Sequence, residues 1–110
     1  MRRDRVAGTD DFGLYPTDYR TAGEFLGLLR QRVPGGVCTL DLRDRMAVFR
    51  WVHEENKAVV DVDHTVSLVE LRESQGDLVH HADALSREWI NQAELSGLEL
   101  TPAVRRKGSG

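Results

Sequence analysis

Cysteine is almost absent from the sequence, and this sets the first limit on the class of the protein. Cys38 is the single cysteine among 110 residues, so no disulfide can form within the chain. A disulfide scaffold is therefore excluded, and a reducing compartment, the cytoplasm, is the expected location. A chain of this length buries roughly 65% of its unfolded surface, which is enough for one domain without disulfides or structural metals.

Long apolar runs are also missing from the sequence. No stretch of about 18 consecutive apolar residues is present, so we predict no membrane span. The basic start, Met1 to Arg5, is followed by no apolar segment of the kind that a secretory signal requires. Both absences favour a cytoplasmic protein.

The chain has no excess of positive charge. Its formal net charge is −3, and its basic residues are scattered along the sequence. Since nucleic-acid binding depends on clustered lysine and arginine, we expect a protein partner rather than a nucleic acid. Lysine itself is scarce, with only Lys57 and Lys107, and Ile90 is the single isoleucine. This residue usage is typical of a GC-rich bacterial genome.

Familiar catalytic and cofactor-binding motifs are absent as well. Gly35-Gly36 is not followed by the Lys-Ser/Thr pair of a phosphate-binding loop, and no G-x-S-x-G nucleophile elbow occurs. Cys38 lies on the apolar side of a predicted strand, where we expect a buried thiol and not a nucleophile. The sequence thus predicts a protein that is not an enzyme and needs no cofactor.

Asp61, Asp63 and His64 form the grouping that most resembles a metal site. On a strand the two aspartates share one face while His64 points to the other. Zn²⁺ requires about three or four converging ligands, and the spacing matches no metalloprotease, EF-hand or zinc-finger pattern. We expect a solvated strand face here, and a metal-dependent enzyme is our third hypothesis. The other candidate ligands are His53, Glu54, His80 and His81.

A helix is predicted over residues 21–33. Thr21-Ala-Gly-Glu24 matches a capping box, in which the threonine and glutamate side chains bond to each other's backbone amides. Pro34-Gly35-Gly36 then stops the helix. Its apolar stripe, at helical spacing, comprises Ala22, Phe25, Leu28, Leu29 and Val33.

The period of the pattern changes to two after this helix. Apolar and polar residues alternate over 37–43, and the apolar segments 46–52 and 58–62 flank a polar turn at 53–57. Asn56 suits a turn because its short side chain tolerates positive φ. The pattern predicts antiparallel strands joined by hairpins.

A helical interpretation competes with these strands and keeps an all-α helical bundle as the alternative fold. The enrichment of β-branched residues in 58–62 and the strict alternation in 37–43 favour strands. The residues that lie near helical spacing are Leu42, Met46, Phe49, Val52 and Val59.

Residues 65–97 allow two predictions. Apolar and glutamine residues recur there every three or four positions, as in one long helix that pairs with another helix. Ser74-Gln-Gly-Asp77, however, is typical of a turn, and an interior glycine costs a helix roughly 1 kcal/mol relative to alanine. We therefore predict a last strand near 66–72, a turn at 74–77 and a helix over 78–96 that stops at Gly97. The buried stripe of that helix would comprise Leu78, Ala82, Leu85, Trp89 and Ala93.

The predicted organisation is a mobile N-terminal arm at 1–16, one globular domain at 17–102 and a disordered basic tail at 103–110. The fold class of the domain is α+β: an N-terminal helix, an antiparallel β-meander of three or four strands and a C-terminal helix. In the arm, we expect Phe12, Leu14 and Tyr15 to pack against the domain.

Residues 21–31 resemble the opening helix of lambda-repressor-like helix-turn-helix regulators. The resemblance covers about a tenth of the chain and implies that two further short helices follow a Gly-containing turn. The alternating segment 37–43 follows instead, so no residue role is carried over. A DNA-associated regulator is the alternative function, and it requires a helical middle of the chain.

A candidate interaction surface lies on and beside the second predicted strand. Its arginines and tryptophan could also combine charge with base stacking, but Asp41, Asp44 and nearby glutamates dilute the positive potential. Our leading hypothesis is a small non-enzymatic protein-interaction or regulatory module, with homodimerisation through an exposed sheet face or through the Leu78–Trp89 helix as an alternative. The candidate surface residues are Arg43, Arg45, Arg50, Trp51 and His53.

Overall fold

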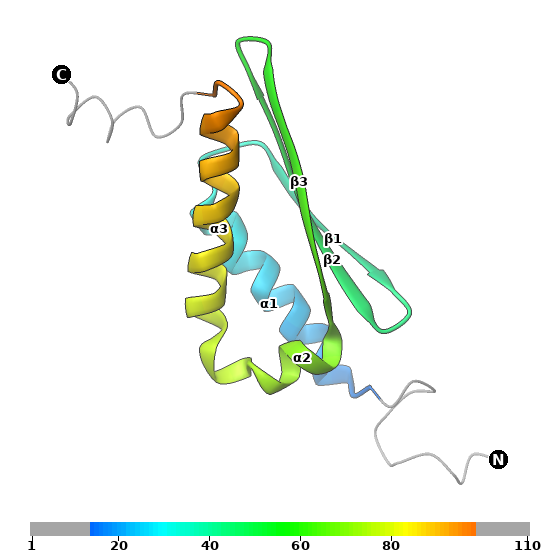
Figure 1. The fold of residues 1–110 in the computed structure, drawn as a ribbon. Helices are drawn as coiled ribbons and strands as arrows, with labels where there is room; N and C mark the ends of the chain where they lie inside the picture. The colour runs from blue at the N-terminus through cyan, green and yellow to red at the C-terminus, as the bar shows by residue number, and fades with distance from the viewer. Residues whose placement is uncertain (1–13, 99–110) are drawn as a thin grey trace, which may run out of the picture.

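One helix, three strands and two further helices follow one another along the chain in the computed structural model, which describes residues 14–98 (Figure 1). The predictions made for residues 1–13 and 99–110 lie outside the described residues. Leu14 is fully buried at the start of the described part. The elements are α1 (Pro16–Arg32), β1 (Val37–Arg43), β2 (Met46–Glu55), β3 (Ala58–Ser67), α2 (Leu68–Glu73), the 3₁₀ turn η2 (Gln75–Asp77) and α3 (Leu78–Leu95).

The three strands form an antiparallel meander in the order β1-β2-β3. This confirms the predicted α+β class, and the all-α alternative is wrong. Two-residue turns join the strands. Asp44 adopts positive φ in the first turn, and Asn56 and Lys57 adopt it in the second, as predicted for Asn56. The second hairpin is tighter than predicted, because β2 extends to Glu55 and β3 begins at Ala58.

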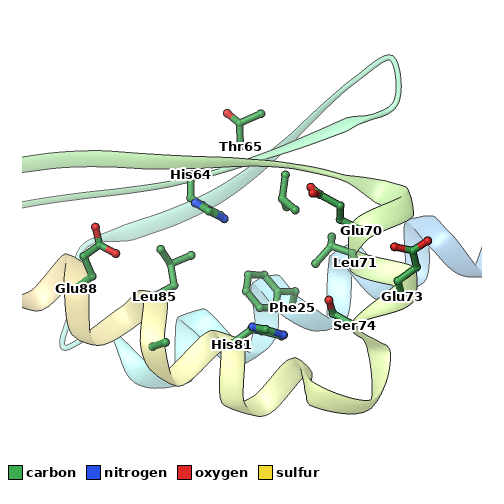
Figure 2. Close-up of a pocket in the computed structure, with 12 residues that line it drawn as sticks. Phe25, His64, Thr65, Glu70, Leu71, Glu73, Ser74, His81, Leu85 and Glu88 are labelled. Atoms are coloured by element: carbon green, nitrogen blue, oxygen red, sulfur yellow. The ribbon is translucent and has the colours of Figure 1, made fainter.

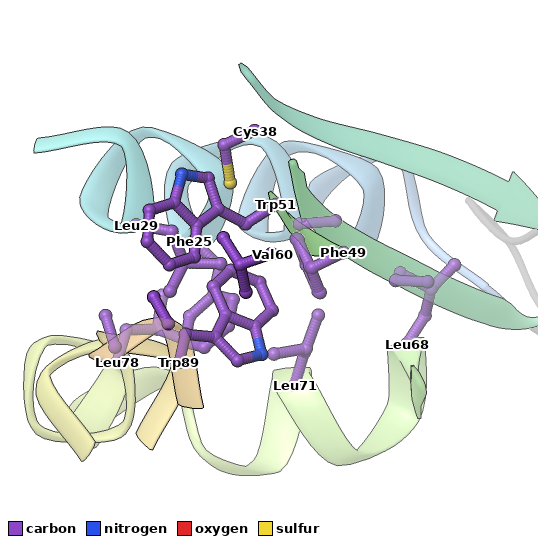
Figure 3. Packing of buried hydrophobic residues seen from close by; sticks show 14 of the residues in the cluster. Phe25, Leu29, Cys38, Phe49, Trp51, Val60, Leu68, Leu71, Leu78 and Trp89 are labelled. Atoms are coloured by element: carbon purple, nitrogen blue, oxygen red, sulfur yellow. The ribbon is translucent and has the colours of Figure 1, made fainter. Parts of the chain in front are cut away.

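All three helices cover the same face of the sheet, and the core lies between them and β2 (Figures 1 and 3). Alternate residues of β2, namely Ala47, Phe49 and Trp51, point to this covered face and have no solvent exposure. Phe25 of α1 meets Phe49 edge to face, with ring centroids 4.9 Å apart. The opposite face, which we call the open face, carries the intervening residues of each strand.

Helix α1 begins five residues earlier than predicted. Proline is favoured in the first turn of a helix, and the Asp18 carboxylate accepts the backbone N–H of Tyr15 at 2.7 Å. Thr21, predicted to cap the helix, instead donates its hydroxyl to the carbonyl of Thr17 within the helix. The helix begins at Pro16 and not at Thr21, because the proline ring fixes φ at a helical value and Asp18 places a carboxylate at the third helical position.

The predicted strand near 66–72 is wrong. Ser67 and Glu70 form a capping box, with the Ser67 hydroxyl accepting the Glu70 amide at 3.0 Å, and this box starts α2. The alternative of one long helix over 65–97 is wrong as well, since the chain breaks between Glu73 and Leu78.

Helix α3 confirms the predicted helix to within one residue at its end. In its predicted stripe, Leu85 is partly buried and the other four residues are buried. Gly97 stops the helix with positive φ, and its N–H donates to the carbonyl of Glu94 while Leu98 donates to Ala93. This pair of bonds is a Schellman motif, which satisfies carbonyls at the helix end. The stripe is used inside the monomer and is not a free surface.

Ion pairs fasten the helices to one another. The Asp18 carboxylate is 1% exposed and accepts both Nε and Nη2 of Arg72, at 2.9 and 2.7 Å. Arg32 of α1 reaches Asp83 of α3 at 2.5 Å. The first pair connects the start of α1 to the end of α2, and its two parallel bonds fix the orientation of both helices.

The loop between α1 and β1 is pressed against β2. The indole N–H of Trp51 donates to the carbonyl of Gly35 at 2.6 Å. Gly36 has φ of +80°, and a Cβ atom there would lie 2.3 Å from the carbonyl oxygen of Val52. Only glycine meets both conditions, so the loop geometry depends on this residue.

We predict that Gly36→Ala lowers the free energy of unfolding by about 2–4 kcal/mol, because strained backbone and displaced neighbours both contribute. Urea denaturation followed by circular dichroism measures the change. Gly27→Ala is the matched control: nothing lies within 4 Å of its added Cβ, so the helix should gain up to about 1 kcal/mol. Equal effects of the two variants would contradict the prediction.

We also predict that Asp18→Ala destabilises the fold by at least about 2 kcal/mol, since it removes a helix cap and the buried partner of Arg72. Asp41→Ala removes a carboxylate that pairs with Arg43 in an exposed position, and it should cost less than about 1 kcal/mol. Denaturation midpoints of the two variants test the contrast. A loss at Asp41 as large as that at Asp18 would show that burial is not the cause.

Candidate functional site

The five residues of the sequence-based candidate surface lie in three places. Arg43 and Arg50 are on the open face, and Arg45 is in the β1–β2 turn. Trp51 is fully buried on the covered face, stacked between His53 and Trp89 with centroid distances of 5.9 and 6.3 Å.

Their role as an interaction surface stays a prediction, and only Arg43 and Arg50 share an exposed sheet face. Trp89 is also buried, as predicted.

Ion pairs occupy the centre of the open face. Arg50 donates from Nε and Nη2 to the two carboxylate oxygens of Asp61, at 2.8 and 2.6 Å across the β2–β3 pair. These bonds lower the pKa of Asp61 and raise that of Arg50. Exposed valines, Val37 and Val59, lie toward one end of the same face.

The candidate metal ligands are divided between the two sheet faces. Asp61 and Asp63 lie on the open face, and His64 lies on the covered face. Asp61 is already engaged by Arg50. Within residues 14–98, no group of three or more histidine, cysteine, aspartate or glutamate side chains is arranged to hold a metal ion.

A groove of about 630 Å³ lies between β3, α2 and residues 81–88 of α3 (Figure 2). Its floor is apolar, formed by Phe25, Leu71 and Leu85, of which Leu85 is only partly buried. Three glutamates stand at its rim, and no lysine or arginine lines it. The remaining lining residues are His64, Thr65, Val66, Glu70, Glu73, Ser74, His81, Ala84 and Glu88.

Sequence reasoning missed this groove because its residues come from four separate elements. From the sequence, His64 and His81 are both candidate metal ligands, and neither is predicted to line a groove. The one local signal was that Leu85 and Glu88 lie one helical turn apart on α3. That spacing gives no information about what stands opposite them.

The outer edge of β3 borders this groove and has no strand partner among the described residues. A two-residue turn makes Glu55 and Ala58 a hydrogen-bonded pair, and the pattern alternates from there. The backbone groups of Asp61, Asp63 and Thr65 therefore point outward. They form a row of donors and acceptors available for another strand.

The other sheet edge differs from the β3 edge. At β1, the outward carbonyl of Cys38 accepts Nε of Arg30 from α1, at 3.0 Å. Cys38 itself is buried, as predicted, and burial raises the pKa of its thiol. The β1 edge is thus partly covered by a side chain, whereas the β3 edge is open.

No helix in the described part of the chain is both long and apolar enough to cross a membrane.

His80 and His81 lie in the first turn of α3, with ring centroids 6.0 Å apart. Of the two, His81 faces the groove (Figure 2).

We predict that acid weakens the fold partly through Asp61. Its folded-state pKa is lowered by Arg50, so the pair stabilises the fold above the unfolded pKa of about 3.9 and is lost as pH falls through the folded value. Asp61→Asn should flatten the fall in unfolding free energy measured by urea titrations between about pH 5 and 3. Arg50→Gln should reduce the fall of the unfolding free energy over the same pH range. An unchanged fall in both variants would show that the Arg50–Asp61 pair is not its cause.

No known protein was found to be similar to this chain. Searches of the chain against protein-family models, curated proteins and solved structures found no match. The function must therefore be argued from the groove, the open strand edge and the charges around them.

Proposed function

We propose that the protein is a small non-enzymatic interaction module that binds an extended segment of a partner protein along β3. One observation carries this proposal: the unpaired edge of β3 runs beside a groove with an apolar floor. An extended segment placed there would form backbone hydrogen bonds to the edge and insert alternate side chains into the groove. Backbone bonds would supply affinity, and the groove would supply selectivity.

The β3 edge suits this role better than the β1 edge. Arg30 already binds an outward carbonyl of β1, so an incoming strand would have to displace it. At β3 the outward groups of Asp61, Asp63 and Thr65 need no displacement. The side chains of these three residues lie on the open face.

Helix α3 defines the far wall of the groove. Trp89 and Ala82 hold α3 in the core, while Leu85 and Glu88 line the groove. Binding would therefore need little rearrangement of the helix, and a preformed site loses less free energy to ordering on association.

The other hypotheses are less well supported. The helix-turn-helix interpretation requires helices in the middle of the chain, where the strands β1 to β3 lie. A metal-dependent enzyme would need Asp61 and His64 to converge on one ion, but these two residues lie on opposite faces of the sheet. A second copy of the chain, bound through the open face, is the alternative protein partner. A bacterial, cytoplasmic origin stays part of the proposal because of the single cysteine and the residue usage.

We predict that Thr65→Pro weakens the binding of linear peptides. A random dodecapeptide library displayed on phage is selected against the immobilised full-length chain, and individual peptides are then titrated. Proline at this outward position keeps the β2–β3 bonds, but its ring and missing N–H block an added strand. Binding should fall at least tenfold, while the circular dichroism spectrum and the melting temperature stay close to those of the wild type.

Leu42→Pro is the matched control, because it places proline at an outward position of the β1 edge. It should keep wild-type affinity for the selected peptides. Hydrogen exchange provides a second measurement that needs no variant: the amides of Asp61, Asp63 and Thr65 should become protected when a peptide binds. Peptide binding that leaves both Thr65→Pro and these amides unaffected would refute strand addition at β3.

A further inference from the structure

We infer that the β3–α3 groove selects an extended segment in which an apolar residue is flanked, two positions away on each side, by lysine or arginine. The inference rests on the proposed function and specifies its partner. It uses the floor of the groove, the charges at its two ends and the repeat of a strand.

The floor of the groove accepts one apolar side chain. Phe25 and Leu71 are almost fully buried beneath it, and Leu85 remains partly exposed. In Figure 2, Phe25 and Leu85 lie between β3 and α3, with His64 and His81 on either side. A leucine-sized side chain placed there would cover the exposed part of Leu85, which favours binding through apolar burial.

Acidic residues stand at both ends of this floor. Glu88 of α3 lies at one end, and Glu70 and Glu73 of α2 lie at the other (Figure 2). No lysine or arginine lines the groove to neutralise them. Arg72, the one arginine of α2, points its guanidinium to the buried carboxylate of Asp18. The two ends therefore attract positive charge, which opposes the binding of acidic segments.

The repeat of a strand determines which residues of a bound segment face the groove. Residues two positions apart on a strand lie on the same face, about 6.6 Å apart. An apolar residue above Phe25 and Leu85 thus places its neighbours two positions away toward the two acidic ends. The long side chains of lysine and arginine cover the remaining distance and keep their charges at the rim.

The intervening residues of the bound segment would lie on the open face. There they stand beside Asp63 and Thr65, the outward residues of β3. Small polar residues such as threonine suit these positions, because they are compatible with a strand and with a solvated face. Acidic residues do not, since the carboxylate of Asp63 would oppose them.

Titration of three capped heptapeptides into the full-length chain tests the inference. The probe is Ser-Lys-Thr-Leu-Thr-Lys-Ser, the charge-reversed peptide has glutamate for both lysines, and the third peptide has serine for leucine. We expect the probe to bind at least tenfold more tightly than either of the others at low salt. Its advantage over the charge-reversed peptide should shrink at 0.5 M salt, because the rim charges are exposed and screened.

Charge reversal on the protein provides the matched test. Glu88→Lys should weaken binding of the lysine probe about threefold to tenfold and strengthen binding of the glutamate peptide, since an attraction becomes a repulsion. Glu24→Lys is the control: it makes the same charge change at an exposed position of α1 that does not line the groove. The control should leave both affinities within twofold of wild type.

The outcomes separate this inference from the proposed function. If the lysine and glutamate peptides bind equally and both protect the amides of β3, the charge selection is wrong and strand addition stands. If neither they nor any library peptide binds, both are wrong. If the probe binds only after Arg105, Arg106 and Lys107 are changed to glutamine, the chain's own tail is the occupant, and the partner assigned here is overturned.

Discussion

The burial of one face of β2 is the interaction on which the rest of the structure depends. Phe49 and Trp51 are completely enclosed there by side chains from α1 and α3, and Trp51 also holds the α1–β1 loop through its indole N–H. Since β2 is the central strand, both hairpins take their position from it. Three helices therefore gather on a single side of the sheet, and the other side is left to solvent.

This asymmetry determines where the partner that we propose could approach. Helix α3 packs on the core through Trp89 and Ala93, while its residues 81–88 stand opposite β3 across the groove. Helix α2 closes one end of that groove, and the Asp18–Arg72 pair fastens α2 to the start of α1. The acidic rim thus rests on elements that are fixed in the core and does not depend on flexible loops.

The elements of the fold could largely be predicted from the sequence, because strand alternation and helix stops are local signals. The two faces of β2 were harder to assign, because Val48 and Val52 on the open face are as apolar as the residues of the covered face. Trp51 was therefore predicted to lie on a surface. Helix α2 was missed because Ser67-Leu-Val-Glu70 is compatible with both a strand and a capping box. The groove joins Phe25, His64 and Glu88, and no local pattern reports a distance between residues so far apart.

The acidic residues along the β3 edge have a consequence for self-recognition. Two copies of this chain that joined their β3 edges in antiparallel fashion would bring the carboxylate of Asp63 close to the β3 carboxylates of the second copy. Like charges facing each other across strands are destabilising, and natural proteins use charged edge residues to prevent unwanted sheet extension. The edge that we propose as the binding site of a basic segment therefore disfavours pairing with its own copy.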